Sequence, residues 1–230
     1  MKEQGQTKRF DVYKLVSYME KINYIWWCLV GTVCFWLVNL PLALCLVLLP
    51  LTPANLPFLL IVLLPAGPAF LALLKTLRQA ETNGQVLRPF FYHLVRETRP
   101  FLRVWLPVWG ILSLAGANLM LGQLLHFSNL LQLMNLFILV AGTTFFLNYC
   151  LLRVFYPQAA VADGLLTTAK LSILKSGRYG MSFMLVLGSF ILLSSVSVYL
   201  FFFGIGAAAL LLLLNYRPIA EYISERTGQN

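Results

Sequence analysis

The side chains that could perform acid–base or metal chemistry are few in this sequence and lie far apart. There are two histidines, His93 and His126, and eight acidic residues, four of which are directly beside a basic residue. No phosphate-binding loop, no G-x-S-x-G nucleophile elbow and no H-E-x-x-H zinc helix is present. Hydrolysis by paired carboxylates would need two acids that converge on one site. The sequence therefore predicts no catalytic, cofactor-binding or metal-binding residues, and we expect a protein that is not an enzyme.

Neutral polar residues are the other chemically capable side chains, and they lie inside otherwise apolar stretches. Ionisable residues inside a membrane span usually mark an ion or substrate path, and the centres of these stretches hold none. This pattern argues against a carrier that uses buried carboxylates to couple transport to protons or sodium ions. The neutral residues are more typical of interhelical hydrogen bonds than of a sugar-sized path. They are Asn39, Asn118, Gln123, Gln132, Asn135, Asn148, Ser194, Ser195 and Ser197.

Two prolines around a glycine, Pro65, Gly67 and Pro68, form the most unusual local pattern. Each proline lacks an amide hydrogen, so the carbonyls of Ile61 and Leu64, four residues earlier, lose their helical partners. A broken helix persists in a membrane only where protein or a water-filled cavity covers the freed carbonyls. In transporters, broken helices mark binding sites. We expect a kinked helix packed against other spans between 64 and 69, and the alternative is a transport path beside the break.

Apolar residues dominate the elements that would position these groups. They make up 60% of the chain, whereas only 11% of residues are charged, against about a quarter in soluble domains. Three runs, 22–74, 104–152 and 179–216, contain no Lys, Arg, Asp or Glu. A helix needs about 20 residues to cross a hydrocarbon core about 30 Å thick, so each run suits two spans. The sequence predicts an all-α, polytopic membrane helical bundle of about six transmembrane helices in three hairpins, with spans near 23–49, 56–78, 104–125, 130–152, 180–202 and 205–219.

Residues that favour turns lie near the middle of each run. The first run has a cluster of helix breakers at Pro50, Pro53, Asn55 and Pro57. The second has its only central polar cluster at 126–129, and the third offers glycines at 203–206. We expect the three hairpin turns at these places.

The distribution of charge predicts the orientation. All charged residues fall in segments 1–21, 75–103, 153–178 and 217–230, with net charges of +2, +4, +3 and zero. With six spans these segments share one side, which the positive-inside rule makes cytoplasmic. The expected organisation is a cytoplasmic N-terminal segment 1–21, one transmembrane domain 22–219 and a cytoplasmic tail 220–230, in a bacterial plasma membrane. A soluble basic protein would spread its charge over its surface, so no nucleic-acid partner is expected.

The basic residues of the two central charged segments are predicted to hold the topology and to contact lipid headgroups or a partner; they are Arg88, Arg96, Arg99, Arg103, Lys170, Lys175 and Arg178. Helical spacing of apolar residues predicts short interfacial helices at 89–98 and 163–176, and a third at 10–19. Pro100 is the expected end of the first, and Gly177 the expected C-cap of the second. The alternative is that these segments are cytoplasmic extensions of the spans.

Several short motifs follow one another along most of the chain. The stretch Gly67-Pro68-Ala69-x-x-Ala72-Leu73-x-Lys75 is followed by a basic stretch and then by Phe90-Phe91 and a second basic cluster. Tyr156-Pro157, Asp163 and a basic helix at 170–178 come later. This order resembles the YesL-like family of bacterial integral membrane proteins, which is classed as a domain of unknown function. Genes of that family often neighbour carbohydrate-uptake systems, so the resemblance implies an accessory membrane component with a sugar permease as partner.

Together these patterns predict a non-enzymatic integral membrane protein that needs no cofactor. Its expected role is that of an accessory or scaffold component associated with carbohydrate uptake, and its expected partners are membrane lipids and a sugar permease or another membrane protein. The alternative is a small transporter or channel with a path near the break at Pro65 and Pro68. A large polar cavity reaching the middle of the membrane would favour transport, whereas a closed apolar bundle would favour a scaffold.

Overall fold

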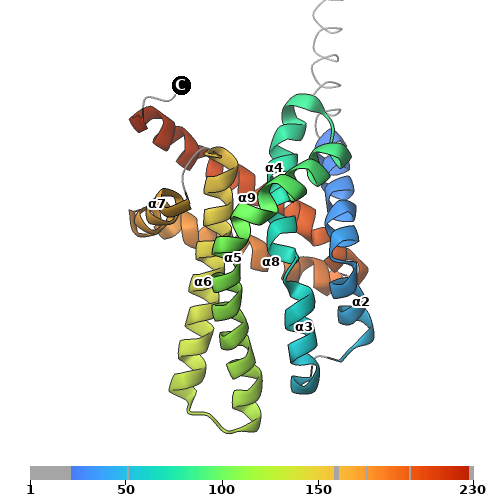
Figure 1. Ribbon diagram of the computed structural model, residues 1–230, viewed down its shortest axis with the longest axis vertical. Helices are drawn as coiled ribbons and strands as arrows, with labels where there is room; N and C mark the ends of the chain where they lie inside the picture. Colours follow the sequence, from blue (N-terminus) through green and yellow to red (C-terminus); the bar gives the residue numbers. More distant parts are fainter. Residues whose placement is uncertain (1–21, 51, 158–160, 175, 197, 228–230) are drawn as a thin grey trace, which may run out of the picture.

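The computed structural model describes residues 22–50, 52–157, 161–174, 176–196 and 198–227, and this part of the chain contains helices and no strands. The predicted N-terminal segment 1–21, with its helix at 10–19, lies outside the described residues. The elements are the helical segment Ile22–Val38, α2 (Leu40–Leu48), the 3₁₀ turn η1 (Pro53–Asn55), α3 (Leu56–Leu63), α4 (Ala66–Asn83), α5 (Leu87–Leu124), α6 (Asn129–Phe155), α7 (Val161–Leu174), α8 (Ser176–Val196) and α9 (Val198–Thr227). The prediction of an all-α helical bundle is confirmed (Figure 1).

Several of the described helices suit a lipid environment. Most of α5, Leu87–Gly122, and all of α6 are long and apolar enough to cross a membrane. Two bent pairs raise the number from two to four if each pair forms one span: Ile22–Val38 with α2, and Pro53–Leu63 with α4. Large apolar side chains also cover the outside of α6, where Leu130, Leu133 and Phe137 are 68%, 62% and 72% exposed. These features are compatible with an integral membrane protein, while six spans and cytoplasmic termini stay predictions.

The first two predicted hairpins run lengthwise and turn at the same end of the molecule (Figure 1). The first turns between α2 and α3, where the Asn55 side-chain amide donates to the Pro50 carbonyl at 3.0 Å. The second turns between α5 and α6, where Ser128 caps α6 by accepting a hydrogen bond from the Leu131 amide at 3.4 Å. Both turn predictions are confirmed. The segment that joins α4 to α5 lies at the opposite end of the molecule. We call this the charged end, because the charged segment 75–103 includes this connection.

The first predicted span, 23–49, is not one straight helix. The chain bends by 82° between Ile22–Val38 and α2. Pro41 lies in the first turn of α2, where its missing amide hydrogen and its ring oppose continuation of the preceding helix. Asn39 at the bend is fully buried, and its side-chain amide donates to the Phe35 carbonyl at 2.9 Å. The bend therefore places a polar group inside the protein rather than in lipid.

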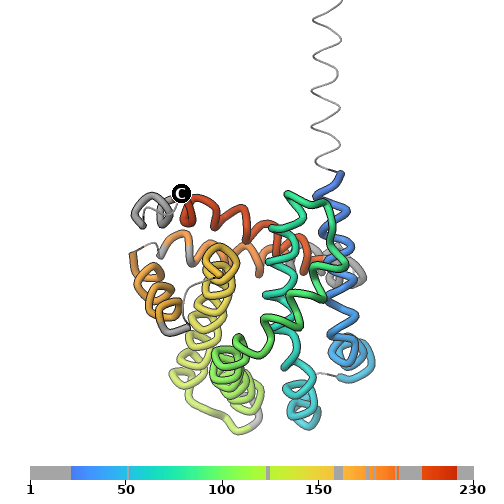
Figure 2. Tube along the Cα trace, turned by 45° about the horizontal axis from the view of Figure 1, so that its top comes forward, coloured from blue at the N-terminus to red at the C-terminus, as the bar shows by residue number. Residues whose placement is uncertain are grey.

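The third predicted turn, at 203–206, is wrong. Residues 203–206 lie inside α9, while α8 ends at Val196 and α9 begins at Val198. Gly206 serves close packing, because a Cβ atom there would overlap the Cys28 carbonyl and the Thr32 hydroxyl. The Gly206 amide donates to Thr32 Oγ1 at 3.1 Å. Figures 1 and 2 also show α8 and α9 running across the two lengthwise hairpins rather than beside them.

The predicted interfacial helix at 89–98 does not end at Pro100. It is the first part of α5, which continues through Pro100 and Pro107 and bends along its length (Figure 1). The lost backbone hydrogen bond is offset because residues just beyond Pro100, among them Phe101 and Trp105, are buried in the core. For this segment the alternative interpretation, an extension of the span, is the one observed. The second segment does form a separate helix, α7, but Gly177 lies in the first turn of α8 and is not its C-cap.

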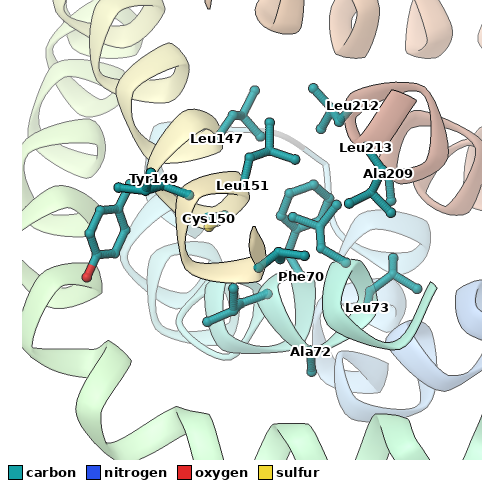
Figure 3. Packing of buried hydrophobic residues seen from close by; sticks show 14 of the residues in the cluster. Phe70, Ala72, Leu73, Leu147, Tyr149, Cys150, Leu151, Ala209, Leu212 and Leu213 are labelled. Atoms are coloured by element: carbon teal, nitrogen blue, oxygen red, sulfur yellow. The ribbon is translucent and has the colours of Figure 1, made fainter. Parts of the chain in front are cut away.

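The apolar core lies where α4, α6 and α9 meet, toward the charged end. Figure 3 shows side chains from these three helices converging on one another. Hydrogen bonds between polar side chains join two further helices to α6. Ser182 of α8 donates to Asn148 Oδ1 of α6 at 3.2 Å, and Asn118 of α5 donates to Asn135 Oδ1 of α6 at 3.4 Å. For these asparagines the prediction of interhelical hydrogen bonds is confirmed. The labelled core residues are Phe70, Ala72, Leu73, Leu147, Tyr149, Cys150, Leu151, Ala209, Leu212 and Leu213.

Candidate functional site

Three charged residues from three helices meet inside the charged end of the bundle. Lys75 Nζ of α4 lies 2.7 Å from Glu97 Oε1 of α5, and Arg153 Nη2 of α6 lies 3.5 Å from Glu97 Oε2. The side chains of Lys75, Glu97 and Arg153 are only 7%, 14% and 11% exposed. We call these three residues the charge cluster.

The charge cluster forms because each basic member follows directly after an apolar run. Lys75 comes after Leu74 and Arg153 after Leu152, both of which are buried in the core. The two basic groups therefore reach the charged end at similar depth, and the first part of α5 brings Glu97 between them. Desolvating these charges is costly, and the Glu97 carboxylate offsets this cost for the buried Lys75 ammonium. The cluster thus ties together three successive helices, α4, α5 and α6.

A cavity of about 630 Å³ opens beside the charge cluster, between α4, α5 and the end of α6. We call it the charged cavity. Arg78 is fixed in its wall, because Nη1 donates to the Val154 carbonyl at 2.6 Å and the guanidinium lies 4.0 Å from the centre of the Phe155 ring. The cavity is lined by Lys75, Arg78, Gln79, Thr82, His93, Arg96, Glu97, Val154, Phe155 and Pro157.

His93 and Gln79 form a hydrogen bond in the wall of this cavity. His93 Nε2 lies 2.8 Å from Gln79 Oε1, and because an amide oxygen only accepts, the imidazole donates. This bond leaves the Gln79 amide nitrogen as a donor. His126, in contrast, lies in the turn between α5 and α6 at the other end of the molecule (Figure 1). The two histidines therefore lie at opposite ends of the described structure.

A second cavity, of about 480 Å³, lies on the other side of Arg78. Its charges balance, since Arg78 and Arg217 face Glu81 and Glu221, and Arg217 forms an ion pair with Glu81. The Tyr156 hydroxyl donates to the Ala220 carbonyl at 2.6 Å and so ties the end of α6 to α9. Burial raises the pKa of this hydroxyl above its usual value, and the nearby charge of Arg78 offsets part of the rise.

The basic residues predicted to contact lipid headgroups do not join the charge cluster. The described ones, namely Arg88, Arg96, Arg99, Arg103, Lys170 and Arg178, are all exposed, and Lys175 lies outside the described residues. On a helix with 100° between residues, the four arginines of α5 share one face about 80° wide. Arg96 alone among these four lines the charged cavity. Contact with lipid headgroups stays a prediction.

The helix of the predicted second span is broken where the sequence predicts the break. Helix α3 ends at Leu63, α4 begins at Ala66, and the pair is bent by 43°. The freed Leu64 carbonyl accepts a hydrogen bond from Trp105 Nε1 of α5 at 2.7 Å, and the Ile61 carbonyl accepts one from the Leu64 amide at 3.2 Å. Trp105 also packs against Gly67, because a Cβ atom at Gly67 would overlap its ring. The break is thus a packed kink, with Gly67 and Pro68 buried.

An open cavity of about 790 Å³ lies farther along α5 and α6, and we call it the apolar groove. Its lining is almost entirely apolar or small, and it includes the exposed side chains of Ile111 and Phe137. Near Gly180, on the rim, no atom lies within 4 Å of where a Cβ would stand. The lining residues are Val108, Ile111, Leu112, Phe137, Val140, Ala141, Gly142, Thr144, Phe145, Ser172 and Gly180.

The charge cluster and Trp105 are the site residues that the sequence reasoning missed. The signal for the basic members was present, since Lys75 and Arg153 are the first charges after two long apolar runs. The partner of each was not visible, because pairing depends on how the helices are rotated about their axes. Trp105 follows the start of an apolar run by one residue, and nothing local distinguishes it from a lipid-facing tryptophan.

No family model, no curated protein and no solved structure matches the chain. The resemblance to the YesL-like family therefore stays a prediction.

Proposed function

We propose that the chain is a non-enzymatic accessory or scaffold protein of the membrane, which holds another membrane protein against its apolar groove. The groove carries the proposal, because this cavity of about 790 Å³ along the apolar part of α5 and α6 has almost no polar lining. A water-soluble substrate would find few hydrogen-bond partners there, whereas a transmembrane helix would find a surface to pack on.

The composition of the groove suits contact between helices. Packing in lipid depends on close approach and shape, so interfaces in membranes are rich in small residues. Ala141 and Gly180 supply small residues beside the larger Ile111 and Phe137. The partner class that the YesL-like resemblance implies, a sugar permease, is itself a bundle of transmembrane helices and would present such a surface.

The alternative, a transporter with its path beside the helix break, finds no support in the packing there. The Trp105 ring fills the space next to Gly67, and its indole nitrogen holds the Leu64 carbonyl. The break therefore has the partners that a structural kink needs.

The proposal predicts a crosslink from the groove to a second membrane protein. A photoreactive benzoyl-phenylalanine at Phe137, inside the groove, should form a discrete protein adduct in growing cells. The matched control is the same residue at Phe58 of α3, which is also exposed at 52% but lies outside the groove. The adduct would be identified by mass spectrometry, and we expect a protein with several transmembrane helices from Phe137 and none from Phe58. Absence of a protein adduct at Phe137, or the same adduct at both positions, would contradict the proposal.

A further inference from the structure

We infer that the charged cavity binds a phosphate-bearing anion, held by Arg78 at its wall and Arg96 at its mouth. The site is separate from the apolar groove, so this inference goes beyond the scaffold role and is tested independently of it.

An excess of positive charge is the first observation. Lys75, Arg78 and Arg96 line the cavity together with a single carboxylate, Glu97. That carboxylate is already engaged by Lys75 and by Arg153 behind it. Glu81 lies near Arg78 on the side of the second cavity, where it is paired with Arg217. Over the charge cluster and both cavities, the basic side chains exceed the carboxylates by two charges, an excess that an anion would balance; the five basic residues are Lys75, Arg78, Arg96, Arg153 and Arg217, and the three acids are Glu81, Glu97 and Glu221.

Preorganisation of the two guanidinium groups is the second observation. Arg78 is held by the Val154 carbonyl and the Phe155 ring, and neither of these carries a formal charge that would neutralise it. Arg96 Nη1 donates to the Tyr92 hydroxyl at 2.5 Å, and its guanidinium lies 5.7 Å from the centre of that ring. Each guanidinium is thus positioned by an aromatic neighbour and keeps further N–H donors.

The donors favour phosphate over other anions. Two planar guanidinium groups offer several N–H groups to a tetrahedral dianion, and this arrangement recurs where proteins recognise phosphate. The Gln79 amide nitrogen adds a neutral donor. A volume of about 630 Å³ falls in the range of small-molecule sites, so it admits a phosphate monoester with a small organic group. The same phosphoryl chemistry is offered by a soluble phosphate ester and by the headgroup of phosphatidic acid.

Titration of the purified full chain distinguishes these two sources. In nanodiscs of phosphatidylcholine, isothermal titration calorimetry with glycerol 3-phosphate tests the soluble source. Nanodiscs that also contain phosphatidic acid, followed by native mass spectrometry for a retained lipid, test the headgroup. In whichever arm shows binding, Arg78→Gln and Arg96→Gln should each weaken it by about tenfold, because each removes a hydrogen bond between charged groups.

Arg99→Gln is the matched control. Arg99 lies on the same exposed face of α5 as Arg96 but does not line the cavity, so the same charge is removed and affinity should stay within about twofold. Binding of either phosphate source with this pattern supports the inference. Absence of binding in both arms, equal weakening by Arg99→Gln and Arg96→Gln, or equal affinity for acetate would overturn it.

Discussion

Replacing Glu97 by glutamine is expected to lower the free energy of unfolding by about 3–5 kcal/mol, because it removes the carboxylate that pairs with the buried Lys75 ammonium. Lys75 and Arg153 both depend on the Glu97 carboxylate, at 2.7 and 3.5 Å, and all three side chains are largely buried. Glutamine keeps the size of the side chain but removes the charge. The effect would be measured in mixed micelles as an equilibrium unfolding titration with dodecyl sulfate, followed by circular dichroism.

Glu81→Gln is the matched control for this loss. It breaks the ion pair with Arg217, whose side chain is 46% exposed, and exposed pairs contribute about 0–1 kcal/mol. Adding Lys75→Met to Glu97→Gln should restore part of the stability, since it removes the buried ammonium that Glu97 paired with. Equal losses from Glu97→Gln and Glu81→Gln would show that the charge cluster does not hold α4, α5 and α6 together.

The second large effect is expected at the helix break. Gly67→Leu forces a side chain into the space of the Trp105 ring, and overpacking of this kind costs about 1–3 kcal/mol. If Trp105 moves away, the Leu64 carbonyl also loses its indole donor, and an unsatisfied buried carbonyl costs about 1–3 kcal/mol more. We therefore expect a loss of about 3 kcal/mol or more in the same unfolding titration.

Gly110→Leu provides the comparison for the helix break. Gly110 lies in α5 with no atom within 4 Å of a Cβ position, and removing a glycine from a helix interior is favourable by up to about 1 kcal/mol. Trp105→Phe keeps an aromatic ring but removes the indole donor together with part of the ring volume, so its loss of stability is an upper limit for the contribution of the hydrogen bond. A Gly67→Leu variant that is as stable as Gly110→Leu would refute the packed kink.

The sequence predicted those features that local chemistry decides. Prolines and polar residues placed the turns at 50–57 and 126–129, and Pro65 with Pro68 placed the helix break. Where tertiary contacts decide, local rules failed. Gly206 suggests a turn by its residue type, but it lies inside a helix. A glycine is needed there because Cys28 and Thr32 approach it closely. The bend at Asn39 did have a local signal, Pro41, which the length of the apolar run concealed.

Pro100 and the charge cluster are two further places where tertiary contacts decide the structure and the local sequence does not. A proline usually ends a helix, yet α5 continues because Phe101 and Trp105 gain burial directly after it. The positions of Lys75 and Arg153 at the ends of apolar runs predict their depth, but not that they face Glu97. Their meeting depends on the rotation of three helices that the core residues of α4 and α6 fix together.

We predict that the lengthwise hairpins cross a membrane with the charged end in the cytoplasm. Two asparagines test it as a pair: Asn83, at the end of α4 on the charged end, and Asn129, at the start of α6 on the opposite end, both exposed. Each is replaced by cysteine and treated in intact cells with a membrane-impermeant maleimide, with the unsubstituted chain as the background. The account predicts that Asn129→Cys reacts in intact cells and that Asn83→Cys reacts only after permeabilisation. Reaction of Asn83→Cys in intact cells, or reaction of both only after permeabilisation, would contradict it.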